Sequence, residues 1–175
     1  MISKRIEEAL NEQIKEELGS AYLYLAMAAY FEAENLPGMA HWMRVQTQEE
    51  LAHAMRIFNH LVERGGRVKL QALAEPAFQW NSPLEAFEAA YKHEQYISER
   101  IHKLVELARA EKDYPAEVML QWFVAEQVEE EDQALKVVEM LRRLGDSGRG
   151  LLWLDKELGK RQGQRVGEEN QGGEE

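Results

Sequence analysis

Residues 46–61 read QTQEELAHAMRIFNHL, and this stretch decides the fold. Residues spaced by three and four positions lie on one face of a helix. On that face Ile57 follows Gln46, Glu50 and His53. The segment is therefore expected to be a long helix whose packed side carries a carboxylate and an imidazole among its apolar residues.

Three other segments have the same helical spacing and are rich in Glu, Ala, Leu, Lys and Arg, which favour helices. Four prolines and a glycine pair at residues 65–66 separate the segments, because neither residue type readily continues a helix. The first helix is expected at residues 3–34, and the second runs from residue 38 to the glycine pair. The third opens at residue 82, and the fourth covers residues 115–144.

The connections predict the topology. Helices one and two, and three and four, are joined by only a few residues, so each pair is expected to be an antiparallel hairpin. Residues 66–81 are a longer connection that could reach about 50 Å when extended, whereas a helix of about 27 residues is about 40 Å long. The expected fold is therefore an all-α antiparallel four-helix bundle with one long crossover.

A short apolar segment follows Gly145. Residues 147–159 contain four leucines and Trp153, enough for one short fifth helix that packs at the end of the bundle or against another subunit. The length of 175 residues suits one domain, expected over residues 1–160. Residues 161–175 are rich in Gly, Gln and Glu and are expected to be a disordered tail.

The composition narrows the range of partners. With 32 acidic and 21 basic residues the net charge is −11, which disfavours nucleic acid and anionic membrane surfaces and favours cations. The absence of Cys leaves carboxylates, His and amides as metal ligands. The N-terminus lacks the apolar core of a signal peptide and no run of 18 apolar residues follows, so a cytoplasmic protein is expected.

One Glu interrupts the packed side of each long helix, at about the same height in the bundle: Glu17, Glu50, Glu94 and Glu130. A lone Glu in such a place usually keeps its head in water. Four buried together would each cost several kcal/mol unless they were protonated or shared cations. With His53 one turn after Glu50, the set supplies oxygen and nitrogen ligands that suit iron or manganese, and four carboxylates favour two ions.

Four segments carry a resemblance to a known family. They are residues 20–25 (SAYLYL), 48–54 (QEELAHA), 63–68 (ERGGRV) and 122–131 (WFVAEQVEEE). On these motifs the sequence resembles the non-haem ferritins of bacteria and archaea over roughly residues 1–160. The resemblance implies a ferritin-like bundle that stores and detoxifies iron.

The resemblance also implies a ferroxidase centre of two irons within each subunit. Glu17, Glu50 and His53 would bind the first iron. Glu50 would bridge to a second iron held by Glu94 and Glu130.

Two further residues are implied to take part in the chemistry of this centre. Gln127 lies beside the irons, where its amide could engage dioxygen, and Tyr24 is a hydrogen-bonding or redox neighbour.

Some prokaryotic ferritins have a third iron site, and Glu49, Glu126 and Glu129 match its positions, with Glu130 shared. From the sequence alone, a solvated face is an equally good interpretation of Glu49 and Glu129.

Related families fit less well. Bacterioferritins and rubrerythrin-like proteins have a second Glu-x-x-His on the fourth helix, where residues 127–130 read QVEE without a His. The bacterioferritin haem ligand, a Met, would fall on Ala52, so no haem is expected.

The resemblance implies that Fe(II) is oxidised by dioxygen or peroxide and stored as ferric mineral in a homo-oligomeric cage of about 24 subunits. Two alternatives remain at this stage. One is a di-iron oxygenase or peroxidase-like relative without storage, and the other is an inert bundle whose central Glu residues are merely solvated.

Overall fold

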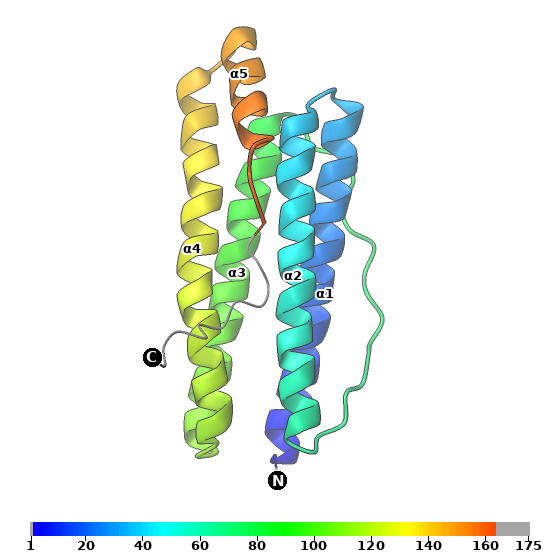
Figure 1. Ribbon diagram of the computed structural model, residues 1–175, viewed down its shortest axis with the longest axis vertical. Coiled ribbons are helices and arrows are strands. Elements are labelled where there is room, and N and C mark those ends of the chain that lie inside the picture. The colour runs from blue at the N-terminus through cyan, green and yellow to red at the C-terminus, as the bar shows by residue number, and fades with distance from the viewer. Residues whose placement is uncertain (1, 164–175) are drawn as a thin grey trace, which may run out of the picture.

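The computed structural model describes residues 2–163, and within this range the chain forms five helices and no strand (Figure 1). The helices are α1 (Lys4–Ala33), α2 (Pro37–Glu63), α3 (Pro83–Ala110), α4 (Tyr114–Leu144) and α5 (Gly148–Leu158). The predicted all-α bundle with a short fifth helix is confirmed. Most of the tail expected to be disordered, residues 164–175, lies outside the described residues.

Four of the five helices have a capping side chain at the residue just before the first turn. Each of these residues accepts a hydrogen bond from a backbone N–H in the first turn, which satisfies a donor that has no partner within the helix. The capping residues are Ser3, Ser82, Asp113 and Ser147. Helix α2 differs, because Leu36 precedes it and offers no side-chain acceptor.

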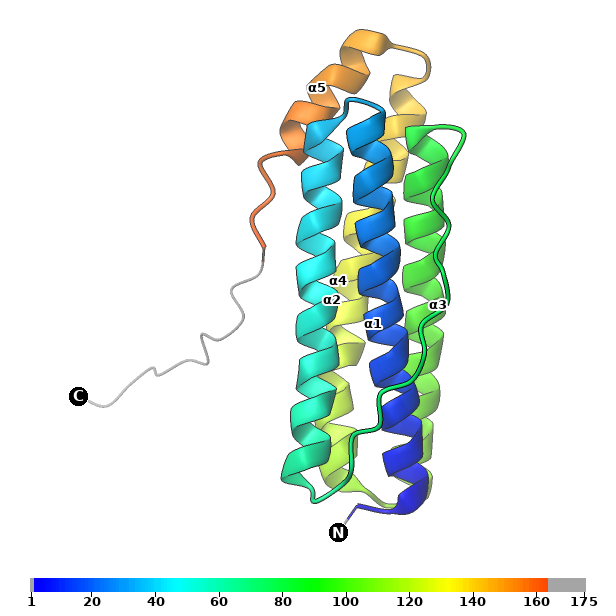
Figure 2. The ribbon, with the colours of Figure 1, turned by 90° about the vertical axis from the view of Figure 1, so that its right-hand side faces the viewer.

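The long helices form two antiparallel hairpins, α1 with α2 and α3 with α4, and the helices pack most closely within each hairpin. Residues 64–82 run along the outside of the bundle from the end of α2 to the start of α3, so α2 and α3 are parallel (Figures 1 and 2). Asn11 holds this crossover to α1. Its Nδ2 donates to the Arg67 carbonyl at 3.0 Å, and its Oδ1 accepts from the Lys69 N–H at 2.6 Å.

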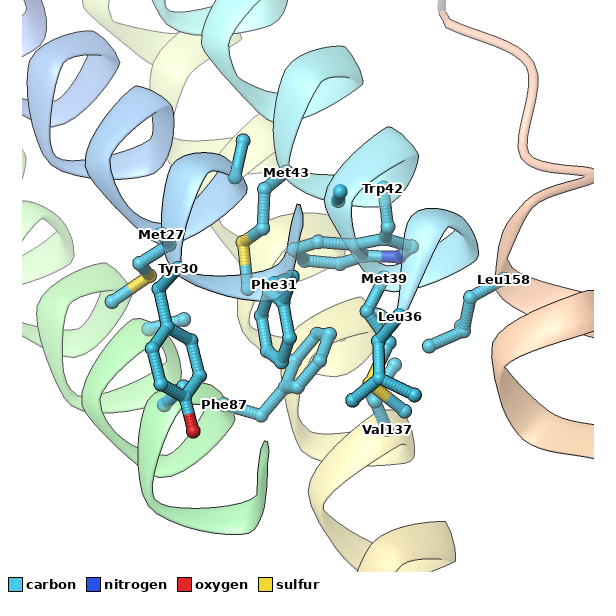
Figure 3. Close-up of a cluster of buried hydrophobic side chains, with 14 of the residues drawn as sticks. Met27, Tyr30, Phe31, Leu36, Met39, Trp42, Met43, Phe87, Val137 and Leu158 are labelled. Atoms are coloured by element: carbon cyan, nitrogen blue, oxygen red, sulfur yellow. The ribbon is translucent and has the colours of Figure 1, made fainter. Parts of the chain in front are cut away.

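Two separate apolar clusters fill the bundle. One lies at the end of the bundle that holds the α1–α2 turn and includes Phe31, Met39 and Phe87 (Figure 3). The other lies toward the opposite end and includes Leu10 and Ile101. On every long helix buried polar residues lie between these two clusters, so the bundle has a buried polar layer at mid-height.

Helix α5 lies across the end of the bundle near the α1–α2 turn (Figure 2). Leu154 and Leu158 are buried in the first apolar cluster, whereas Leu152 and Trp153 are 65% and 56% exposed. The leucines of this helix therefore pack partly on the bundle end, as one of the two expected arrangements required. Among the helices of residues 2–163, none combines the length and apolar character needed to cross a bilayer.

Candidate metal centre

Each long helix contributes one almost fully buried Glu to the polar layer: Glu17, Glu50, Glu94 and Glu130. These are the four residues that the phase of the helices had singled out. Their helices also bring buried amides and one imidazole to the same layer, from Gln13, Gln46, Gln127 and His53. The layer therefore gathers buried oxygen and nitrogen donors between two apolar clusters.

Glu17, Glu50 and His53 form the first group of potential ligands, with one donor atom of each within 4.8 Å of the others. His53 Nδ1 lies 3.4 Å from Glu50 Oε2 and 3.9 Å from Glu17 Oε2. All three of these atoms are buried and lack a hydrogen-bond partner. Buried polar atoms are rarely left unsatisfied, so three that converge on one point suit a bound cation.

Two neighbours orient this first group. Gln13 Nε2 donates to Glu17 Oε1 at 2.8 Å, which leaves Glu17 Oε2 turned toward His53. The imidazole of His53 packs edge-on against Trp122, with ring centroids 5.4 Å apart. These contacts hold the carboxylate and the ring in place before any metal binds.

His53, Glu126 and Glu130 form a second group, again with donor atoms within 4.8 Å of one another. The Gln46 amide donates to Glu130 Oε2, while Glu130 Oε1 has no hydrogen-bond partner. The sequence predicts Glu130 at the second metal with Glu94, and also shared with Glu126 at a third metal position. The structure places Glu126 close enough to Glu130 to share a metal with it.

Glu94 accepts hydrogen bonds on both of its carboxylate oxygens. The Tyr24 hydroxyl donates to Glu94 Oε1, and Gln127 Nε2 donates to Glu94 Oε2 at 3.1 Å. Tyr24 and Gln127 therefore both lie beside the centre, where they were expected. A metal bound by Glu94 would share the carboxylate with these two donors, which each oxygen's second lone pair allows.

The packing of carboxylates changes their acidity. Burial, and then the charges of Glu94, Glu17 and Glu130, raise the pKa of Glu50 well above its usual value. Burial also raises the pKa of Glu94 to about 7, although the hydrogen bonds from Tyr24 and Gln127 oppose this change. The raised pKa values favour the protonated forms of these carboxyl groups when no metal is bound. Bound cations would favour their charged forms instead.

Tyr24 remains a neutral donor in this environment. Burial, reinforced by the charge of Glu94, raises the pKa of its hydroxyl well above the usual value. His93 packs edge-on against the Tyr24 ring at 6.1 Å, and its Nε2 lies 2.7 Å from Ser20 Oγ. Burial lowers the pKa of His93 to about 4, so this imidazole is neutral and hydrogen-bonded near pH 7.

The residues suggested for a third site are divided between the interior and the surface. Glu49 and Glu126 are buried, whereas Glu129 is exposed on α4. Glu49 Oε2 accepts a hydrogen bond from Arg161 Nη2 at 2.7 Å. Sequence reasoning had no signal for Arg161, because its position depends on how the chain leaves α5.

Gln13 and Gln46 were also missed as parts of the centre, although a signal existed for both. Each lies on the packed face of its helix in phase with the buried Glu residues. An amide at such a position has to find a partner when it is buried, and here the partners are the site carboxylates Glu17 and Glu130.

Comparisons with known proteins place the chain in a family. The family model described as the ferritin-like domain matches residues 7–144. A bacterial non-heme ferritin of Bacteroides fragilis is 42% identical over 161 residues, which cover 92% of this chain and 100% of that protein. One from Staphylococcus aureus is 38% identical and covers 92% of this chain and 97% of its own length.

A solved structure is similar in both fold and sequence. The open-pore ferritin of the hyperthermophilic archaeon Archaeoglobus fulgidus matches with a TM-score of 0.92 and 57% identity. The match covers 93% of this chain and 100% of that one.

Proposed function

Since this chain belongs to the ferritin family, we propose that it stores iron by oxidising Fe(II) in its buried polar layer and retaining the ferric product as mineral in an oligomeric cage. The observation that carries the proposal is the convergence of the unpartnered Glu17, Glu50 and His53 atoms at the centre of the bundle. Carboxylate oxygens with one imidazole nitrogen form a donor set that suits iron.

Two Fe(II) ions are the substrate of this centre. Glu17, Glu50 and His53 would hold the first ion. Glu50 would bridge to the second ion, which Glu130 on α4 and Glu94 on α3 would hold. Each Fe(II) gives up one electron, and dioxygen takes up both electrons with two protons to leave as hydrogen peroxide. The protein's part is to hold both metals close together while leaving them open to the oxidant.

Neighbouring residues support this chemistry without replacing the ligands. Tyr24 and Gln127 hold the Glu94 carboxylate from opposite oxygens. The Gln127 Nε2 that donates to Glu94 is also the group that would engage dioxygen beside the metals. Proton loss from Glu50 and Glu130, whose pKa values are raised mainly by burial, accompanies metal entry.

A third metal position lies outside this pair. Glu126 belongs to the second ligand group, Glu49 lies next to Glu50 in sequence, and Glu129, although exposed on α4, would complete the position. We place the ferric product's exit and later storage inside a closed homo-oligomer of about 24 subunits. The net charge of −11 per chain suits a container for cations.

Replacement of the bridging ligand tests the proposal. Glu50→Ala should slow the fast phase of Fe(II) oxidation by at least about tenfold, since even indirect partners of metal ligands are worth about 10–100-fold. Stopped-flow absorbance after aerobic addition of Fe(II) measures this rate. Glu63→Ala is the matched control, because Glu63 is an exposed residue at the end of the same helix.

The outcomes separate the alternatives. An unchanged initial rate in Glu50→Ala would remove Glu50 from the chemistry. Turnover by the unaltered protein without a large soluble ferric core would favour an oxygenase-like relative. Oxidation no faster than in buffer would leave an inert bundle.

A further inference from the structure

The chain beyond α5 turns back along the bundle (Figure 1), and Arg161 reaches Glu49 on α2. The Arg161 carbonyl lies 2.8 Å from His41 Nε2. Gly163 lies beside Val45, one helical turn further along the same face of α2; a Cβ built on this glycine would be 3.6 Å from Val45 Cγ1. Residues 160–163 therefore follow α2 toward Glu49, one turn beyond Val45.

Arg161 is held on several sides in this position. Its guanidinium lies over the Trp42 ring, 4.3 Å from the centroid. Nη2 donates to Glu49 Oε2 at 2.7 Å and to Gln133 Oε1 at 2.8 Å, which joins α2 to α4. The Arg161 and Glu49 side chains are only 12% and 7% exposed, so solvent screens this ion pair weakly.

The guanidinium borders the second ligand group. Gln133 lies one turn after Glu130 on α4, and Glu49 directly precedes Glu50 on α2. Glu130 Oε1, buried and without a hydrogen-bond partner, belongs to the ligand group with His53 and Glu126.

We propose that Arg161 is a tethered counter-cation that competes with metal for Glu49, so that filling the outer metal position displaces Arg161 and releases residues 160–163 from α2. This inference rests on the third metal position proposed above. A divalent ion at Glu49 would meet a fixed positive charge within contact distance and would have to replace its charge-assisted hydrogen bond.

This arrangement predicts the order in which metal ions fill the inner and outer positions. The inner positions offer atoms of Glu17, Glu50, His53 and Glu130 that have no hydrogen-bond partner, whereas Glu49 at the outer position is already paired with the chain's own cation. Metal therefore fills the inner pair first, and the outer position fills only at higher concentration. The state of the C-terminal segment reports whether that outer position is occupied.

Calorimetric titration with Zn(II), which cannot be oxidised by dioxygen, tests the competition in the assembled full-length protein. Arg161→Gln should bind the outer Zn(II) about tenfold more tightly, a change of about 1.4 kcal/mol, with the two inner ions unaffected. Lys160→Gln is the matched control. It removes the same charge from the adjacent residue, whose side chain pairs with Glu157 instead.

Arg161→Lys should give an intermediate affinity, because it keeps the charge but loses the forked hydrogen bonds and the planar stacking on Trp42. The double variant Glu49→Gln with Arg161→Gln should lose the outer binding event altogether.

Hydrogen exchange in the unaltered protein gives a readout that depends on no variant. Amides of residues 160–163 should exchange faster once Zn(II) fills the outer position, whereas in Glu49→Gln added Zn(II) should cause no further change. Equal outer affinity in the unaltered protein and Arg161→Gln, or weaker binding in the variant, would overturn the competition. Two inner ions would still bind in that case, whereas failure to bind them would count against the proposed function itself.

Discussion

Glu94 shows how a single buried carboxylate links stability to pH. Its pKa is raised to about 7 mainly by burial, while an unfolded chain would return it to the ordinary range near 4.5. A group with a raised folded-state pKa contributes its full stability below the unfolded value and loses that contribution as the pH rises through the folded one. The free energy of unfolding of the metal-free protein should therefore fall by a few kcal/mol at most between pH 5 and pH 8.

Thermal unfolding at the two pH values, with metal removed by a chelator, measures this loss. Zn(II) should reverse it, because the ions stabilise the charged carboxylates. Glu94→Gln is the control variant and should show a smaller decrease than the unaltered protein. Equal unfolding temperatures at pH 5 and pH 8 in the metal-free protein would contradict the assignment of Glu94 as a buried acid.

At this scale, sequence reasoning identified residues whose position follows from helical phase. Glu17, Glu50, Glu94 and Glu130 all lie on packed faces, and the structure buries all four. Arg161 could not be found in this way, because no repeating pattern relates residue 161 to Glu49; only the path of the chain after α5 brings them together.

Among the helices, the start of α2 depends on α5. Helix α2 has Pro37 at its first turn and no capping side chain of its own. Asp155 of α5 supplies the missing acceptor, because its Oδ1 accepts from the Met39 N–H at 2.8 Å. Gly38 permits this contact, since a Cβ there would lie 1.7 Å from the Asp155 carbonyl oxygen.

Asp155→Ala should therefore lower the free energy of unfolding by about 1 kcal/mol, the usual cost of losing a helix cap. Gly38→Ala should cost more, because α5 must move away to make room for the methyl group. Chemical denaturation followed by circular dichroism measures both. Lys156→Ala, an exposed change on the same helix, serves as the control, and an Asp155 variant as stable as this control would remove Asp155 as a cap.

The ends of the long helices could be predicted because their signals are local. Ser82 caps α3 by accepting from the Glu85 N–H at 3.1 Å, and Gly65 ends the α2 turn with a positive φ of 72°. The docking of α5 could not be predicted as well. Its apolar side indicated only that it must pack somewhere, whereas its partner at Met39 is 116 residues away in sequence.

At the scale of the whole molecule, α5 has two apolar sides with different surroundings. Leu154 and Leu158 pack on the bundle, whereas Leu152 and Trp153 face outward. Large apolar side chains exposed together on one short helix favour contact with another subunit. In a closed oligomer, symmetry repeats any such contact in every subunit.

The double change Leu152→Ser with Trp153→Ser should weaken or reshape the cage while leaving the single chain folded. Burying each side chain contributes about 1.5–3 kcal/mol, which matters when repeated by symmetry. The metal-centre residues lie on the long helices, so the initial rate of Fe(II) oxidation should be unchanged while less mineral is retained. Particle sizing and iron loading measure both effects. Deletion of residues 162–175, which spares α5 and Arg161, is the control and should leave the particle size unchanged. A cage of normal size and full iron loading from the double variant would show that this side of α5 makes no subunit contacts.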